Sequence, residues 1–242
     1  MKENYKVWPA GKLPKEWQRP ELGQLKEAGY DLKDPRDAVT IFEQKVAKFA
    51  GSMYAVAVDS CTDAVMLCLN YLVDTGRLEK GRELLFPARC YVSIPMVAMA
   101  NGFKVEFEDR EWSGVYNIEP TSIYDGATRF TKDMYIQGCY QCISFQIKKR
   151  LPIGKGGMIL TNDAQAVDYF RMASFEGRDL TVDQWSDNYT VRGWNMYMTP
   201  DDAARGILIF DALMEQSEVW DDTQDSSTYR DLRKQKIFKK GI

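Results

Sequence analysis

The pattern of hydrophobic and polar positions predicts alternating helices and strands. From Asp37 to Phe49 the apolar residues recur at helical spacing, and Gly51 follows as a stop signal. Residues 54–58 form a short β-like run. Residues 64–73 are apolar on nearly every side, which is typical of a buried central helix. The sequence therefore predicts a helix, a strand and a buried helix in succession.

Short strands and helices continue to alternate beyond this unit, joined by short links. We expect strands at 83–86, 103–107, 122–125, 141–145 and 158–161, and helices at 92–101, 164–174 and 200–218. Such alternation is typical of an α/β fold, and we predict a three-layer α/β/α arrangement around a mostly parallel sheet.

The ends of the chain differ from its middle. Residues 1–36 are polar and contain several prolines, so we expect an N-terminal arm with one short helix near 20–28. Residues 37–219 carry the α/β pattern and form the predicted main domain. Residues 220–242 are charged and weakly periodic, and we expect a C-terminal tail or the remnant of a small domain.

Composition narrows the range of functions. The chain has 242 residues, of which 45% are hydrophobic, and a formal net charge of −3. This favours a soluble protein and argues against a nucleic-acid or membrane partner, since the excess of positive charge is missing. The sequence contains no histidine. That excludes Ser-His-Asp and Cys-His catalysis, so the chemistry must use other side chains or a cofactor.

The five cysteines include one C-x-x-C pair, Cys139 and Cys142. A zinc site would need further ligands, and a thioredoxin-type turn would need a different context. We therefore expect no metal and reduced cysteines, as in a cytoplasmic protein.

Three positions carry candidate chemistry, and each has an ordinary alternative. Ser60-Cys61-Thr62 stands at a helix start and suits a phosphate, or is a plain helix cap. Lys149 lies between a strand and a glycine-rich turn and suits a Schiff base, or is a surface lysine. Asp125 ends a strand and suits a pyridinium N–H, or is a turn aspartate. Along the chain the helix start at residues 60–62 comes first, followed by Tyr91, Asp125 and Lys149. A phosphate site, an aromatic ring for stacking, a partner for a ring nitrogen and an amine for a Schiff base are together what a pocket for pyridoxal 5′-phosphate needs.

Four stretches then resemble one family of proteins. Ser144-Phe145 with Lys149 and 154–157 is similar to the pattern S-F-x-x-x-K-x-[LI]…G-E-G-G. The other three stretches are residues 42–64, 87–93 and 193–204. Together they resemble the DegT/DnrJ/EryC1/StrS family, the pyridoxal-phosphate-dependent sugar aminotransferases of fold type I.

The resemblance implies roles for individual residues. Lys149 would be the lysine that forms the aldimine and shuttles protons, Asp125 would pair with the ring nitrogen, and Tyr91 would stack on the ring. A second group of residues would complete the cofactor site: Ser60, Cys61, Thr62 and Ser144 at the phosphate, Thr128 where the family has Gln or His beside the phenolic oxygen, and Asn195 reaching the phosphate in the partner subunit. The last of these implies a homodimer with shared active sites.

The chain is shorter than the family pattern in two places. Family members insert a further strand and helix between Asn117 and Ser122, and they continue after Glu218 into a small domain that is mostly missing here. The resemblance implies transfer of an amino group, with glutamate as the expected donor, to a keto sugar nucleotide. Two further possibilities stay open: an impaired relic that binds the cofactor or a nucleotide sugar or serves as an interaction subunit, and a related dehydration, against which Lys149 counts. A compact version carried by a virus would act in the cytoplasm of an infected host cell.

Overall fold

The computed structural model describes residues 19–215 and 224–239. Three predicted segments lie partly outside the described residues. They are the arm, before residue 19; the helix predicted to reach residue 218, at its end; and the tail, at residues 220–223 and 240–242. No helix in the described ranges is both long enough and apolar enough to cross a membrane.

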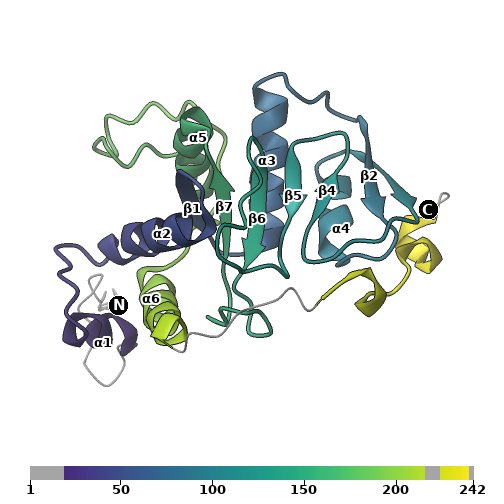
Figure 1. The fold of residues 1–242 in the computed structure, drawn as a ribbon. Helices are drawn as coiled ribbons and strands as arrows, with labels where there is room; N and C mark the ends of the chain where they lie inside the picture. Colours follow the sequence, from purple (N-terminus) through teal and green to yellow (C-terminus); the bar gives the residue numbers. More distant parts are fainter. Residues whose placement is uncertain (1–18, 216–223, 240–242) are drawn as a thin grey trace, which may run out of the picture.

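A mixed β-sheet runs through the centre of the molecule (Figure 1). Five strands are ordered β1-β7-β6-β5-β4, and β2 and β3 form a parallel pair beside them. Backbone hydrogen bonds between Leu85 and Glu119, of 2.8 and 3.2 Å, join this pair to the end of β4. The strands are β1 (Tyr54–Val58), β2 (Glu83–Pro87), β3 (Lys104–Glu108), β4 (Tyr116–Ile118), β5 (Ile123–Asp125), β6 (Tyr140–Ser144) and β7 (Gly157–Thr161).

The prediction of a mostly parallel sheet was wrong. Only β5–β6 and β2–β3 pair in parallel, whereas β1–β7, β6–β7 and β4–β5 are antiparallel. At β4 and β5 the reason is the length of the link between the two strands. Residues 119–122 join β4 to β5, and a parallel crossover needs a dozen or more residues, so this short link allows only a hairpin. The extra strand and helix expected for the family at this point are replaced by that hairpin.

Helices cover both faces of the sheet, which gives the three layers predicted. Along β1, Val56 and Val58 face one core while Ala55 and Ala57 face the other, because successive strand side chains point to opposite faces. The helices are α1 (Glu21–Glu27), α2 (Asp37–Ala50), α3 (Cys61–Asp74), α4 (Ser93–Ala100), α5 (Ala164–Ser174) and α6 (Pro200–Glu215). α3, α4 and α5 pack on the first face, and α1, α2 and α6 belong to the second.

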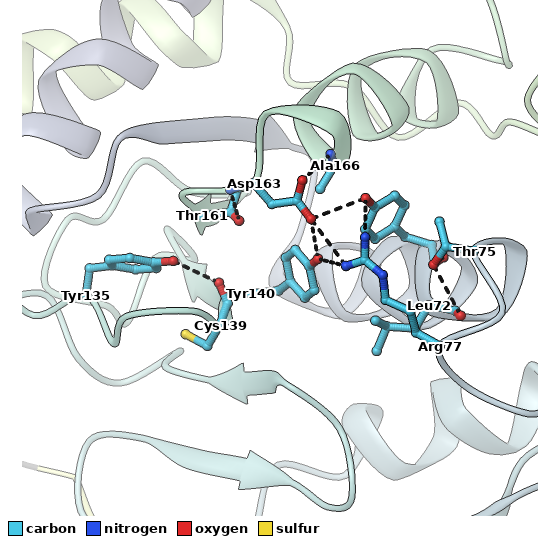
Figure 2. A network of polar contacts seen from close by, with 10 residues as sticks. Leu72, Thr75, Arg77, Tyr135, Cys139, Tyr140, Thr161, Asp163 and Ala166 are labelled. Atoms are coloured by element: carbon cyan, nitrogen blue, oxygen red, sulfur yellow. Dashed lines mark hydrogen bonds and ion pairs between the residues drawn. The ribbon is translucent and has the colours of Figure 1, made fainter.

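A polar network fixes the amino-terminal end of β6 (Figure 2). The Asp163 carboxylate caps α5 through the Ala166 N–H, at 3.1 Å. It also accepts hydrogen bonds from the hydroxyls of Tyr140, at 2.7 Å, and Tyr71, at 3.2 Å, and from Arg77. One side chain thereby ties β6, α3 and α5 together at the end of β6 that lies away from Ser144.

The C-terminal segment, defined as residues 224–239, contains the short 3₁₀ helices η2 (Ser226–Thr228), η3 (Leu232–Lys234) and η4 (Lys236–Phe238). It lies beside β2, at the opposite side of the molecule from α1 and α2 (Figure 1). Leu232 is buried in the core, and the ring of Phe238 packs edge-on against Phe107 at 5.1 Å. Although the sequence predicted a weakly structured tail, these contacts attach the segment to the sheet. The proposed division into arm, main domain and tail stays a prediction.

Candidate active site

A cavity opens at the edge of the sheet where β1, β2, β5 and β6 have their carboxyl ends. In open α/β sheets this edge is the usual place for a ligand. The cavity has a volume of about 420 Å³, which falls in the range of small-molecule sites. Seven of the residues predicted for the site line it: Ser60, Cys61, Thr62, Tyr91, Asp125, Ser144 and Lys149.

The first turn of α3 forms one wall of the cavity. Ser60 is the N-cap residue in extended conformation, and its hydroxyl accepts the Asp63 N–H at 3.1 Å. The Thr62 hydroxyl hydrogen-bonds that of Ser93, at 2.7 Å. The first N–H groups of a helix have no partner within it and carry the positive end of its dipole. This wall therefore suits an anion such as phosphate.

Gly157 allows β7 to approach this wall closely. A Cβ at this position would lie 2.3 Å from the Ser60 carbonyl carbon and 2.4 Å from the Cys61 nitrogen. Real side chains do not tolerate such distances, so the position needs glycine. The close packing of β7 on the helix start fixes where the α3 N–H groups point.

Asp125 lies at the bottom of the cavity and is 4% exposed. Its Oδ2 accepts the Tyr116 hydroxyl at 2.6 Å, and its Oδ1 accepts the Ala127 N–H at 2.9 Å. Burial raises the pKa of Asp125, while the hydrogen bond from Tyr116 and the charge of Lys149 act in the opposite direction. A positive group in the cavity would therefore stabilise the carboxylate form.

Lys149 lies on a turn that backbone hydrogen bonds hold closed. The Phe145 N–H donates to Gly156 O at 2.9 Å, and the Lys149 N–H donates to Gln146 O at 2.8 Å. Burial raises the pKa values of both Asp125 and Cys61, and the charge of Lys149 opposes both shifts, so the ammonium acts across the same cavity. The acid and the amine thus lie around one space, rather than on opposite sides of the molecule.

An aromatic ring and two further lysines complete the rim. Tyr91 is 57% exposed and lines the cavity, so its ring is open to stacking. Lys148 and Lys155 also line it, and the Lys155 Nζ is 2.8 Å from the Asp59 carboxylate. With Lys149, these side chains make the cavity attractive to anions.

Thr128 and Asn195 do not line this cavity, although the resemblance placed both at the cofactor. The Thr128 hydroxyl donates to Gly114 O at 3.0 Å. The Asn195 amide donates to Glu176 at 2.8 Å, and the residue lines a neighbouring hollow of about 230 Å³, which shares Lys155 and Gly156 with the cavity. Within one chain, therefore, these two residues stand apart from the others.

Sequence reasoning missed several residues of the site. Tyr116, which holds Asp125, lies on a strand too short to show an alternating pattern. Gln224, Thr228 and Tyr229 line the cavity from the C-terminal segment, where no motif marked them. Only their chemistry, an amide and two hydroxyls in a charged stretch, could have drawn attention to them.

The C-x-x-C pair takes no part in the cavity. Cys139 and Cys142 are both buried and unpaired, and the Cys142 thiol lies 3.8 Å from that of Cys68. Burial raises the pKa of Cys139 to about 12, so its thiol stays protonated and inert. Among residues 19–215 and 224–239, no group of three or more metal-binding side chains could hold an ion.

The fold and the cavity together define an α/β protein with a lysine, a buried acid and an anion-binding helix start around one site. Residues 32–140 and 137–224 match the model of the DegT/DnrJ/EryC1/StrS aminotransferase family. The chain belongs to this family, whose members are pyridoxal-phosphate-dependent sugar aminotransferases.

Individual relatives agree with this assignment. The spore coat polysaccharide biosynthesis protein SpsC of Bacillus subtilis is 26% identical to this chain, in a match that covers 77% of this chain and 59% of SpsC. Among solved structures, the sugar aminotransferase CalS13 from Micromonospora echinospora matches with a TM-score of 0.65 and 14% identity, over 81% of this chain and 65% of CalS13. AtS13 from Actinomadura melliaura matches with a TM-score of 0.66 and 20% identity, over 81% of this chain and 64% of AtS13. The chain thus spans less than two thirds of each of these proteins.

The residues around the cavity fit the cofactor that the family uses. The α3 start and the hydroxyls of Thr62 and Ser144 offer donors for a phosphate, Asp125 offers a buried carboxylate, and Lys149 offers an amine. The close approach at Gly157 keeps the helix start in place as one side of this cradle. The cavity thus offers the three kinds of chemical group that pyridoxal phosphate needs: hydrogen-bond donors, an acid and an amine.

Proposed function

We propose that the protein is an aminotransferase that binds pyridoxal phosphate in this cavity and transfers an amino group from an amino acid, with glutamate as the expected donor, to a keto sugar nucleotide. The observation that carries the proposal is that Asp125 and Lys149 line one cavity whose other wall is the start of α3. The donor becomes a 2-oxo acid and the ketone becomes an amine, so no external oxidant or reductant is needed.

Each residue has a separate task. When bound, pyridoxal phosphate supplies an aldehyde that condenses with amines and a protonated ring that withdraws electrons. The amine of Lys149 binds the aldehyde and moves a proton at the substrate carbon that carries nitrogen. Asp125 holds the proton on the ring nitrogen, and Tyr91 covers the ring face. Ser60, Cys61, Thr62 and Ser144 hold the phosphate.

The surroundings of the cavity support a nucleotide sugar as substrate. Lys148 and Lys155 stand at the rim and suit the diphosphate of such a molecule. We further propose a homodimer in which Asn195 reaches the phosphate in the partner subunit, since within one chain it lines the neighbouring hollow and not the cavity itself. The cysteines described are all unpaired, which favours the reducing cytoplasm.

Cofactor binding by the full chain tests the proposal. Added pyridoxal phosphate should give an absorbance band of the lysine-bound form, and borohydride reduction should leave the cofactor mass on the peptide that holds Lys149. Lys149→Ala should lose both signals, whereas the control Lys132→Ala, at an exposed lysine away from the cavity, should keep them. Amino transfer from glutamate to a 4-keto sugar nucleotide would then establish the reaction. If the wild-type chain shows neither band nor adduct, the proposal fails.

One observation favours a second function. The Thr128 hydroxyl donates to Gly114 O rather than facing the cavity. A relic that binds the cofactor or a nucleotide sugar without amino transfer would fit this contact. Binding of pyridoxal phosphate together with absence of transfer, tested over several keto sugar nucleotides, would favour this second function.

A further inference from the structure

The C-terminal segment forms a fixed wall of the cofactor cavity. On one side, the Gly114 N–H donates to Gln224 O and the Ser226 N–H donates to Trp112 O, both at 3.0 Å. On the other side, the Leu232 N–H donates to Ala88 O at 2.8 Å. The segment is thus held between the strand that precedes Tyr91 and the loop that precedes β4.

Tyr229 is the aromatic residue of this wall, and its ring is held in place. Its centroid lies 5.5 Å from that of Trp112, whose indole N–H donates to Arg89 O at 2.8 Å. The Arg89 guanidinium in turn donates to Tyr229 O at 3.3 Å. These contacts use the ring and the backbone of Tyr229 and do not involve its hydroxyl.

The hydroxyl of Tyr229 makes only a weak hydrogen bond within the described residues. Its hydrogen bond in the described part of the chain, to Gln224 Oε1, is 3.4 Å long, near the limit for such a bond. Burial, and then the charge of Asp125, raise the pKa of Tyr229 to about 12. The phenol therefore keeps its proton at neutral pH and can donate it to an acceptor in the cavity.

The sheet order indicates which acceptor this is. The helix start that suits the phosphate adjoins β1 and β7, Asp125 ends β5 in the middle, and Tyr229 is attached beside β4 and β2. Tyr229 and the phosphate wall are therefore on opposite sides of Asp125. In pyridoxal phosphate, the phenolic oxygen and the phosphate arm are likewise on opposite sides of the line from ring nitrogen to aldehyde.

We propose that the Tyr229 hydroxyl donates a hydrogen bond to the phenolic oxygen of pyridoxal phosphate bound in the cavity. The inference rests on the proposed function, because it concerns the same cofactor in the same site. Tyr229 is a positioning residue here, because it holds the cofactor ring between Asp125 and Lys149. It takes the place beside the phenolic oxygen that the resemblance gave to Thr128, whose hydroxyl donates to Gly114 O instead.

Tyr229→Phe in the full chain tests this role, because the variant keeps the ring packed on Trp112 and removes only the oxygen. The dissociation constant of pyridoxal phosphate, measured by absorbance titration, should rise about tenfold, since the lost hydrogen bond joins a charged acceptor. The pH midpoint of the bound cofactor's absorbance change should rise by about one unit. Without the hydrogen bond from Tyr229 the phenolate is less stable, so the proton that the phenolic oxygen shares with the neighbouring lysine nitrogen is lost only at higher pH. Tyr189→Phe, at an exposed tyrosine away from the cavity, should change neither quantity.

The possible results separate this inference from the proposed function. If wild-type protein and Tyr229→Phe bind the cofactor with the same affinity and pH midpoint, the inference is overturned and the proposed function stands. The same holds if Tyr229→Phe weakens only the binding of an added nucleotide sugar. If the wild-type protein binds no pyridoxal phosphate, the proposed function falls and this inference falls with it. Thermal unfolding of the variant near the wild-type temperature would confirm that it is folded.

Discussion

Tyr116 and Asp125 face each other in register across β4 and β5, and the phenol donates a 2.6 Å hydrogen bond to the carboxylate. Both side chains are buried, with 5% and 4% of their surfaces exposed. A buried carboxylate is costly unless it is hydrogen-bonded, so this cross-strand pair makes an acid possible at the bottom of the cavity. The hairpin that shortens the sheet also delivers the donor that the acid needs.

Tyr116→Phe should therefore destabilise the protein by about 1–3 kcal/mol at neutral pH, because Asp125 loses a donor in a buried place. Tyr116 lowers the pKa of Asp125, so its removal raises that pKa further above the unfolded value. Ionised Asp125 then costs more in the folded state, and the loss should be greater at pH 8 than at pH 4. Urea unfolding at the two pH values measures this, with Tyr124→Phe on the neighbouring strand β5 as the control. Equal losses at both pH values would contradict the role of Tyr116.

Gly157→Ala should disrupt the start of α3, because the new Cβ would lie 2.3 Å from the Ser60 carbonyl carbon. We expect the melting temperature to fall by about 10 °C or more and binding of pyridoxal phosphate to weaken, since the phosphate wall must move. Gly23→Ala is a matched control in the middle of α1, where nothing lies within 4 Å of the new atom. That variant should be neutral or slightly more stable. A Gly157→Ala protein as stable as the wild type would rule out the close approach described here.

Glu43→Ala should destabilise the protein, because it removes a polar link between α2 and β1. The Glu43 carboxylate is buried, accepts the Ala57 N–H at 2.8 Å and pairs with Arg171 at 2.6 Å. The variant leaves a buried N–H without a partner, which costs about 2–3 kcal/mol in the free energy of unfolding. Glu43→Gln keeps an acceptor for that N–H and should cost less. Urea unfolding compares both with Glu27→Ala, at an exposed position in α1, and a loss of the same size in all three would refute the argument.

Asp63→Asn should flatten the dependence of stability on pH. Burial, followed by a hydrogen bond with Asp59, raises the pKa of Asp63 to about 6. The unfolded value is about 4, so between these values the folded protein binds more protons, and stability falls as the pH rises through this window. In the variant the difference between pH 4.5 and pH 7 should shrink by about 1 kcal/mol, a discounted figure because the carboxyl is only partly buried. Asp168→Asn, at an exposed site in α5, serves as the control. If the free energy of unfolding varies with pH in the same way in the wild type and in Asp63→Asn, Asp63 is not the source of this pH dependence.

Local signals in the sequence were enough to place most of the elements, although not β4, and most of the residues that line the cavity. Helix α5 spans Ala164–Ser174 as predicted, because Asp163 caps it and its apolar face is periodic. Asp125 and Lys149 could be found because each follows a recognisable strand. Their chemical roles stay predictions, as do those of Thr128 and Asn195.

Long-range relationships were not predictable in the same way. No strand was predicted at β4, whose antiparallel pairing with β5 follows from the short link of residues 119–122. The wall formed by Gln224 and Tyr229 depends on backbone pairing with residues 112–114, which are more than a hundred positions away in the chain. No periodic pattern reports such a contact.

The hairpin of β4 and β5 makes the neighbourhood of Asp125 a local unit. The acid and its phenolic partner are nine positions apart, on two strands joined by one tight turn. The two strands therefore carry the acid and one of its donors together, while Cys61 and the charge of Lys149 reach Asp125 from other parts of the chain. Grafting residues 116–127 as one piece into a longer relative would carry the acid with the hydrogen bonds from Tyr116 and Ala127.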